Sequence, residues 1–243
     1  MAFRAQRGRL AGASLIRDAI DRGDALAALL VDEGAATAEA SAVVDLARDA
    51  GIPIFLESRR EMRRMSEGDR VEALLAVAGR PLAGDLETLM SAPGIVLILA
   101  GLRYPGNVGF IMRSAEVAGA AGVVLASGWS AGEREEASRI SIRADRFLPV
   151  LDADAGRAVN AARSAGRQIL AIETSGKDTP WSLDLSIPTA LLLGSEADGL
   201  PPGLLARVDR AIRIPTRGFI PSYNVQAAAG IVLGEWLRQT DAP

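Results

Sequence analysis

Apolar runs alternate with amphipathic segments from about residue 95 to the end of the chain. The stretches 95–101 and 122–127 are almost continuously apolar, which is typical of strands buried on both faces of a parallel sheet. Several segments between such runs have the spacing of helices with one apolar face. The pattern predicts strands and helices in alternation over 95–101, 107–119, 122–127, 134–141, 147–151, 155–166, 168–173, 190–195, 202–208, 211–215 and 224–239. We therefore expect an α/β fold with a mostly parallel sheet and helices on both faces.

The first part of the chain has the same character on a smaller scale. It predicts a helix over 10–22, a strand over 28–32, a helix over 37–50 with Thr37 as its N-cap, a strand over 52–56, a basic helix over 57–65 and a strand over 71–77. The glycines and proline of 79–84 indicate a linker, and 86–91 leads into the second unit. We expect two domains, a small α/β domain over 1–84 and a larger one over 85–243.

Composition adds limits to this organisation. With 243 residues, of which 49% are hydrophobic and 23% charged, each of two domains can bury a core of its own. No apolar run approaches the roughly 20 residues that a membrane-spanning helix needs, so we expect no membrane partner. The N-terminal residues lack the apolar core of a signal peptide. We therefore expect the protein to be cytoplasmic.

The chain has neither cysteine nor histidine. This excludes disulfides, thiolate chemistry and any serine–histidine triad, and it removes the commonest metal ligand, so we expect no metal. Chemistry must come from Arg, Lys, Asp, Glu, Ser, Thr, Tyr, backbone groups or a cofactor. The formal net charge of −3 argues against a nonspecific nucleic-acid coat but is compatible with a local basic patch.

Three polar segments follow or interrupt apolar runs in the second unit. They are Asn107-Val-Gly109-Phe-Ile-Met-Arg113-Ser-Ala115, Leu193-Gly-Ser-Glu196, and the stretch from Ile214-Pro215 to Ser222-Tyr-Asn224. Ligands of parallel α/β sheets bind at the carboxyl ends of the strands. Gly194 would allow a close backbone approach there because it has no Cβ. A dinucleotide-dependent oxidoreductase is disfavoured, since the spacing G-x-G-x-x-G is missing.

Each of these residues also has a purely structural interpretation. Asn107 alone is more typical of a helix cap than of a catalytic group, and Arg113 could be solvated or ion-paired. Glu196 could belong to a turn, and Ser222 or Asn224 could cap the last helix. These separate interpretations do not explain why the residues occur together, in this order and after strands. The combination therefore predicts a functional site.

The three segments resemble the three motifs of the SpoU family, the RNA 2′-O-ribose methyltransferases of the SPOUT superfamily. The matching positions are Asn107-x-Gly109-x-x-x-Arg113-x-Ala115, Gly194-x-Glu196-x-x-Gly199 and Ile214-Pro215 with Ser222-x-Asn224-Val225, and the resemblance covers about residues 94 to 239. The N-terminal unit is similar, more loosely, to the ribosomal-protein-like substrate-binding domain of many members. The chain departs from the family pattern at Arg103-Tyr-Pro-Gly106, where an aspartate-containing loop is usual, and at Thr216, Tyr223 and Gln226.

The resemblance implies several properties. The catalytic domain would contain a C-terminal trefoil knot, an exception to the rule against threaded chains, and would work as a homodimer. S-adenosyl-L-methionine would be the cofactor, held by loops around Thr174, Gly194, Ile214 and Tyr223. The catalytic set would be Asn107, Arg113, Glu196, Ser222 and Asn224. The substrate would be RNA, ribosomal RNA in preference to transfer RNA.

The chemistry of these side chains narrows their roles. A guanidinium hardly deprotonates in proteins, so we expect Arg113 to anchor the target phosphate and stabilise the developing alkoxide rather than act as a base. Glu196 would orient Asn107 or Arg113. Ser222 and Asn224 would position the hydroxyl and the loop that carries them.

Two groups of arginines are candidates for contacts to RNA phosphates. One is on the basic helix of the N-terminal unit, and the other precedes the strand at 147–151: Arg59, Arg60, Arg63 and Arg64, then Arg134, Arg139, Arg143 and Arg146. The alternative for the first group is a solvated helix face. The alternative for the whole protein is a catalytically inactive, knotted RNA-binding protein, which the presence of the complete candidate catalytic set disfavours.

Overall fold

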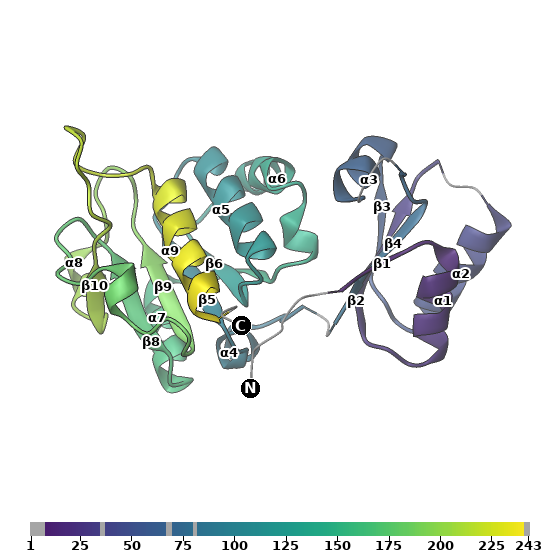
Figure 1. Ribbon diagram of the computed structural model, residues 1–243, viewed down its shortest axis with the longest axis horizontal. Helices are drawn as coiled ribbons and strands as arrows, with labels where there is room; N and C mark the ends of the chain where they lie inside the picture. Colours follow the sequence, from purple (N-terminus) through teal and green to yellow (C-terminus); the bar gives the residue numbers. More distant parts are fainter. Residues whose placement is uncertain (1–7, 35–36, 67–69, 80–81, 241–243) are drawn as a thin grey trace. The chain divides into compact units, whose positions relative to one another are not determined.

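The computed structural model describes residues 8–34, 37–66, 70–79 and 82–240, which divide into two compact units between Leu82 and Ala83 (Figure 1). The expected linker at 79–84 spans this boundary, but its residues 80 and 81 lie outside the described part of the chain. Each unit has its own sheet and its own apolar core.

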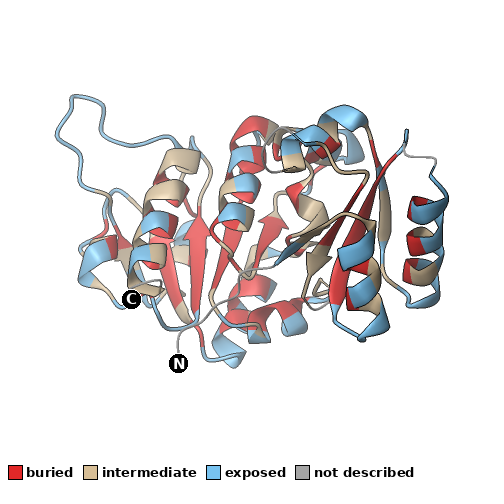
Figure 2. Ribbon diagram, turned by 45° about the vertical axis from the view of Figure 1, so that its right-hand side comes forward, coloured by how far each residue is buried: buried red, intermediate tan, exposed pale blue. Residues whose placement is uncertain are grey.

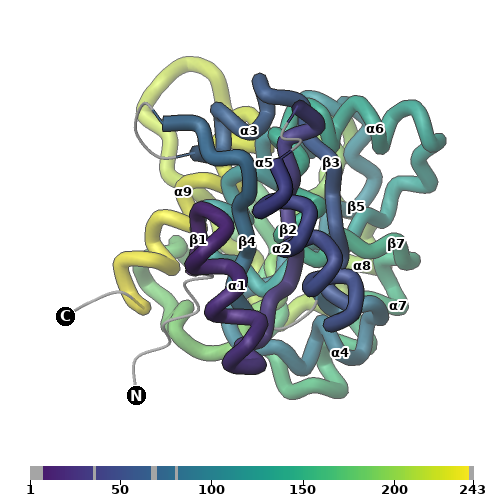
Figure 3. The backbone as a smooth tube through the Cα atoms, turned by 90° about the vertical axis from the view of Figure 1, so that its right-hand side faces the viewer, coloured from purple at the N-terminus to yellow at the C-terminus, as the bar shows by residue number. Residues whose placement is uncertain are grey.

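The N-terminal unit is a four-stranded sheet with helices packed on it. Its strands are β1 (Arg9–Ala11), β2 (Leu26–Asp32), β3 (Ile54–Glu57) and β4 (Leu74–Ala78), in the order β1-β4-β2-β3, with only the β2–β3 pair parallel. Helices α1 (Ala13–Asp21) and α2 (Ala38–Asp49) share one apolar cluster with the sheet and lie side by side in Figure 3. Helix α3 (Arg59–Met65) follows β3.

Local sequence explains most of these elements. All seven residues of β2 are buried, as its apolar run predicts, and Thr37 caps α2 by accepting a hydrogen bond from Ala40 N at 3.1 Å. The expected helix over 10–22 is wrong at its start. Its first two residues belong to β1, which pairs antiparallel with β4, and Gly12, with φ of 89°, turns the chain from strand to helix.

The second unit contains the parallel sheet that the alternation predicts. Its strands are β5 (Ile95–Ala100), β6 (Gly122–Ala126), β7 (Val150–Asp152), β8 (Gln168–Ile172), β9 (Thr189–Leu193) and β10 (Arg210–Ile212). The order is β10-β8-β9-β5-β6-β7, and every pair is parallel. Most of the strand residues are buried (Figure 2), because helices cover both faces.

The helices form two layers on this sheet, each with its own apolar cluster. Helices α5 (Pro105–Val117), α6 (Ala131–Ile140) and α9 (Val225–Thr240) cover one face. Helices α4 (Leu86–Ser91), α7 (Ala155–Ser164) and α8 (Pro202–Leu205) cover the other. Short 3₁₀ turns lie at η1 (Ala144–Arg146) and η2 (Pro180–Ser182). The apolar face of α9 packs into the core through Ala228, Ala229, Val232, Leu233 and Trp236.

Arg167 is a buried cation with a structural role. It is 4% exposed, and burial lowers the pKa of its guanidinium to about 10. Its nitrogens donate to the carbonyl oxygens of Met90 and Gly94 at 2.7 Å, and also to those of Ala92 and Thr189. It therefore ties the segment between α4 and β5 to the start of β9.

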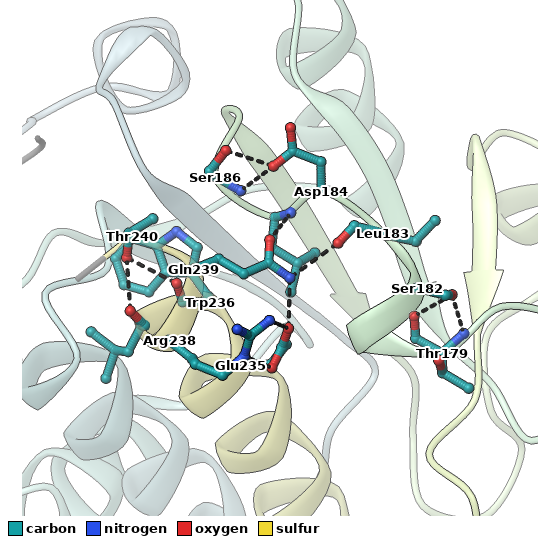
Figure 4. Close-up of polar contacts among 12 residues, drawn as sticks. Thr179, Ser182, Leu183, Asp184, Ser186, Glu235, Trp236, Arg238, Gln239 and Thr240 are labelled. Atoms are coloured by element: carbon teal, nitrogen blue, oxygen red, sulfur yellow. Dashed lines mark hydrogen bonds and ion pairs between the residues drawn. The ribbon is translucent and has the colours of Figure 1, made fainter. Parts of the chain in front are cut away.

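Side-chain hydrogen bonds also attach the end of α9 to the segment that follows η2 (Figure 4). Gln239 accepts from Leu185 N at 2.7 Å and donates to the carbonyl of Leu183 at 3.1 Å. It also donates to Glu235, which receives a bidentate pair from Arg238. The helix that begins at the candidate site is thus fixed at its far end.

Candidate active site

Three of the five expected catalytic residues meet beyond the carboxyl ends of β5, β9 and β10. The amide nitrogen of Asn107 donates to Glu196 Oε1 across 2.5 Å. The amide nitrogen of Asn224 donates to Asn107 Oδ1 across 3.2 Å. Asn107 is the central member and is 7% exposed, whereas Glu196 and Asn224 are exposed. The structure thus joins the three motifs through one amide, in the arrangement expected if Glu196 orients Asn107.

Asn107 is held in place by the first turn of α5. The helix begins at Pro105, where a missing N–H costs nothing, so Asn107 lies inside the first turn rather than capping it. Gly109 brings α6 close, because a Cβ there would stand 2.8 Å from both the carbonyl oxygen of Ala137 and Cβ of Ile140. The indole of Trp129 adds a hydrogen bond of 2.8 Å to the carbonyl of Leu102.

Asn224 has the capping role that its position predicts. Its side-chain oxygen accepts from Gln226 N at 2.8 Å, and its carbonyl accepts from Ala228 N at 2.9 Å. Asn224 therefore both starts α9 and reaches Asn107. On the second of the three segments, Ser195 and Gly199 pair through two backbone hydrogen bonds, and this turn carries Glu196.

Arg113 and Ser222 do not join the hydrogen-bonded cluster. Both are exposed, and neither side chain has a hydrogen bond or ion pair within the described residues. Arg113 lies two turns into α5. Its guanidinium is therefore open to an anion from outside the chain.

The segments expected to hold the cofactor pack backbone against backbone. A Cβ on Gly194 would stand 2.5 Å from Leu200 N, and a Cβ on Gly176 would stand 2.5 Å from the carbonyl carbon of Ile212. Thr174 and Ile214 each lie two positions beyond the last residue of a strand, β8 and β10 respectively. Tyr223 is 46% exposed, and its hydroxyl lies 3.5 Å from the carbonyl of Pro215. These loops offer closely spaced backbone groups at one edge of the sheet.

Sequence reasoning missed Glu173, which organises this edge. Its carboxylate accepts from Leu200 N at 2.9 Å, and its own N–H donates to the carbonyl of Ile212 at 2.9 Å. It therefore links the ends of β8 and β10 to the loop that follows β9. The only signal in the sequence is a charged residue directly after a buried strand, next to the expected Thr174.

Some arginines of the two candidate RNA-binding groups form ion pairs within the protein, and others have no partner among the described residues. Arg59 pairs with the buried Asp32 at 2.8 Å and lowers the pKa of that carboxyl. Arg60, Arg63 and Arg64 are exposed, and no partner is found for them among the described residues. Within the second group Arg134 pairs with Asp152, and Arg143, which has a positive φ of 57°, pairs with Glu135 at 2.7 Å. Burial lowers the pKa of Arg146.

Three features elsewhere in the described chain bear on other kinds of site. The described residues contain no group of three or more acidic side chains placed to hold a metal ion. No described helix is long and apolar enough to cross a bilayer. A hollow between α4 and α7, lined by residues such as Glu87, Arg157 and Asn160, contains none of the expected site residues.

Comparisons with known proteins agree with the motif assignment. Residues 94–234 match the model of the SpoU rRNA Methylase family. A protein of Xylella fastidiosa named 23S rRNA (guanosine-2'-O-)-methyltransferase is 31% identical over 223 residues, covering 87% of this chain and 88% of that protein. A putative TrmH family tRNA/rRNA methyltransferase of Bacillus subtilis is 28% identical over 218 residues, or 87% of each chain.

Solved structures extend this likeness to the fold. The AdoMet-bound rRNA methyltransferase from Sinorhizobium meliloti has a TM-score of 0.61 at 25% identity, over 95% of this chain and 86% of its own. The SpoU methyltransferase AviRb from Streptomyces viridochromogenes, in complex with AdoMet, has a TM-score of 0.60 at 25% identity, over 98% of this chain and 92% of its own.

Proposed function

The chain belongs to the SpoU rRNA methylase family and is an S-adenosylmethionine-dependent RNA 2′-O-methyltransferase, and we propose that its substrate is ribosomal RNA. The expected family, α/β fold, reaction and cofactor are confirmed. The choice of ribosomal over transfer RNA rests on the 23S rRNA named for several relatives. The inactive RNA-binding alternative is disfavoured by the intact cluster of Asn107, Glu196 and Asn224.

The residues at the edge of the sheet fit the cofactor. Glycines at 176 and 194 permit backbone contacts that a Cβ would block, and such loops can hold an adenosine through N–H and carbonyl groups. The proposed cofactor-binding residues are Thr174, Gly194, Ile214 and Tyr223. S-adenosylmethionine supplies the electrophilic methyl group when bound, so the protein has to align the ribose and stabilise its oxygen.

The observation that carries the proposed catalytic site is the hydrogen-bonded cluster at the start of α5, together with an exposed arginine of the same helix, Arg113, that has no partner among the described residues. The hydrogen bond between Asn107 and Asn224 joins the first turn of α5 to the start of α9. Arg113 lies further along α5, and Ser222 lies two positions before Asn224. Arg113 would bind the phosphate next to the target ribose and stabilise negative charge on its 2′-oxygen. Ser222 would position the hydroxyl, because its own hydroxyl has no partner among the described residues.

The finer architecture is part of the same proposal. We assign residues 1–84 to substrate binding, with Arg60, Arg63 and Arg64 open to phosphates and Arg59 also held by Asp32. We assign residues 85–243 to catalysis and retain the trefoil knot for the C-terminal segment. The enzyme would act as a homodimer in the cytoplasm without a metal. Exposed apolar side chains on α5, Phe110 at 48% and Val117 at 76%, support an interface there.

A methyl-transfer assay tests the proposed function. Purified protein is incubated with S-adenosylmethionine carrying a radioactive methyl group and with deproteinised 23S rRNA, 16S rRNA or total tRNA. We expect label in a ribosomal RNA, at one linkage that resists alkaline hydrolysis because its 2′-oxygen is methylated. Label in tRNA alone would contradict the substrate assignment. Label on a base, with every linkage still cleaved by alkali, would contradict the site of transfer.

A further inference from the structure

Tyr104 combines high exposure with a position next to the proposed active site. Its side chain is 63% exposed, although aromatic residues make up only 4% of the chain and tyrosine occurs twice. It immediately precedes α5 and lies three positions before Asn107. An aromatic ring left in solvent so close in the chain to this cluster of polar groups requires an explanation.

The backbone of Tyr104 is firmly tied to the helix that carries Asn107. Its carbonyl accepts hydrogen bonds from Asn107 N at 3.1 Å and Val108 N at 3.4 Å. Its ring lies directly against Gly106, where a Cβ would stand 2.5 Å from Cε1 of the tyrosine and 2.9 Å from Cζ. The ring is therefore supported by backbone on one side while much of it remains accessible.

Stability does not account for a tyrosine at this position. Tyr104 is the N-cap of α5 but makes no side-chain capping hydrogen bond, whereas Ser, Thr, Asp or Asn would satisfy a helix N–H. The exposed ring also buries little apolar surface. The residue thus forgoes the contribution of a cap and gains little from packing, which favours a role in binding.

The surrounding charge is suited to a nucleic acid. Arg103 is exposed beside Tyr104, and Arg113 is exposed on the same helix. No acidic residue occurs between Arg103 and Glu116. An accessible ring next to an exposed arginine, Arg103, is a combination that suits single-stranded RNA, because a base stacks on the ring while the cation contacts a phosphate.

Resting on the proposed function, we propose that Tyr104 is a stacking platform for an unpaired base of the RNA, at or next to the nucleotide whose ribose is methylated. Gly106 is required because it leaves room for the ring. Arg103 contacts a phosphate of the same strand. Tyr104 is thus a substrate-binding residue that selects an unstacked base, since a base inside a duplex cannot reach the ring.

The test compares three variants with a matched control. Tyr104→Ala removes the ring, Tyr104→Phe keeps it, and Gly106→Ala displaces it without changing its chemistry. Trp181→Ala removes another exposed ring, 53% exposed, from η2. Affinity is measured by fluorescence anisotropy with a labelled single-stranded oligoribonucleotide and with the corresponding RNA duplex. KM and kcat are measured on the ribosomal RNA that the wild type methylates.

We expect Tyr104→Ala to weaken single-strand binding and raise KM by about tenfold, with duplex binding unchanged. Trp181→Ala should resemble the wild type, and Tyr104→Phe should lose much less affinity than Tyr104→Ala, because it keeps the ring. Gly106→Ala should also raise KM, yet it should melt at the same or a higher temperature, because alanine favours the helix. This variant and Tyr104→Phe keep the test decisive even if Tyr104→Ala fails to fold.

Three results would overturn the inference. The first is single-strand affinity and KM unchanged in both Tyr104→Ala and Gly106→Ala. The second is that Tyr104→Ala binds S-adenosylmethionine more weakly than the wild type in calorimetry, which would make the ring a cofactor contact. The third is that Tyr104→Ala differs from the wild type in oligomeric state, measured by light scattering, which would make the ring a contact with a second copy of the chain. If the wild type methylates no RNA, the proposed function fails, and the anisotropy comparison still tests Tyr104 separately.

Discussion

Asn107 and Glu196 are 89 positions apart in the chain, and the amide of the first donates to the carboxylate of the second across 2.5 Å. The same amide accepts from Asn224, which is 117 positions away. A single side chain therefore connects three loops through one donor and one acceptor. Its replacement should affect substrate turnover more than global stability, because only this corner of the fold depends on it.

The donor and acceptor roles of this pair can be exchanged. Asn107→Asp places two carboxylates together, so we expect kcat to fall by about tenfold or more, through repulsion and the lost donor. Adding Glu196→Gln restores a donor opposite the new carboxylate, and the double variant should recover part of the lost rate. A double-variant cycle measures this coupling. Additive effects of the two changes would show that the hydrogen bond has no functional role.

Arg113 is open to a ligand, and its removal should abolish most of the activity. We expect Arg113→Ala to lower kcat about 100-fold or more, the range seen when a group that stabilises transition-state charge is lost. Its melting temperature should stay at the wild-type value, because Arg113 has no partner within the described residues. Arg157→Ala, an exposed arginine of α7, is the matched control. Full methyl transfer by Arg113→Ala would refute its role.

Gly194 has no room for a side chain. In Gly194→Ala the added Cβ meets the backbone of Gly199 and Leu200, so the end of β9 must shift. We expect a loss of stability of about 1–3 kcal/mol and much weaker S-adenosylmethionine binding in calorimetry. Gly203→Ala in α8, where no atom lies within 4 Å of the new Cβ, should leave both unchanged. Equal cofactor affinity in the two variants would contradict a cofactor site at Gly194.

The two buried tryptophans should respond differently to phenylalanine. Trp129 donates to the carbonyl of Leu102, so Trp129→Phe leaves that oxygen unpaired and should cost about 1–3 kcal/mol. Trp236 is 3% exposed, and its Nε1 has no partner among the described residues. Trp236→Phe removes this unpaired donor, which offsets the lost packing. Its free energy of unfolding, measured with urea, should change by about 1 kcal/mol or less.

The hydrogen bonds that Glu235 receives near the end of α9 should stabilise the folded protein less at acid pH. Hydrogen bonds from Arg238 and Gln239 lower the pKa of its carboxyl from 4.5 to about 2 in the folded protein. The folded state therefore binds this proton less readily than the unfolded state, and the stabilisation is complete above about pH 4.5 and is lost as the pH falls towards 2. The melting-temperature difference between the wild type and Glu235→Gln should be largest near pH 7 and shrink below pH 4. A difference independent of pH would contradict this prediction.

The sequence predicted the parallel sheet because strands such as Ile95–Ala100 are apolar on both faces, a pattern that only a covered sheet explains. It did not predict β1, because three residues leave no measurable period and the strand exists only through its pairing with β4. The start of α5 was also misplaced, since Pro105 is a favourable first helical residue rather than a helix breaker.

The sequence could name the residues of the candidate site and narrow the partner of Glu196 to two, but most of its long-range contacts could not be predicted. Asn107, Glu196 and Asn224 could be named from their motifs, and the structure decides that Glu196 holds Asn107. Glu173 was missed because its partner, Leu200 N, is 27 positions away. The pairing of Arg59 with Asp32 was hidden for the same reason. Long-range polar contacts leave no periodic signal in a sequence.

The bond between Asn107 and Asn224 also has a consequence for biosynthesis. A ribosome makes the chain from its N-terminus, and domains made first can fold first. The strand before α5 is complete by residue 100, but the partner that completes the cluster is encoded 117 residues after Asn107. A nascent chain can therefore have its first domain folded and still carry no assembled cluster. The enzyme acquires this proposed active site only in the last stage of its own translation.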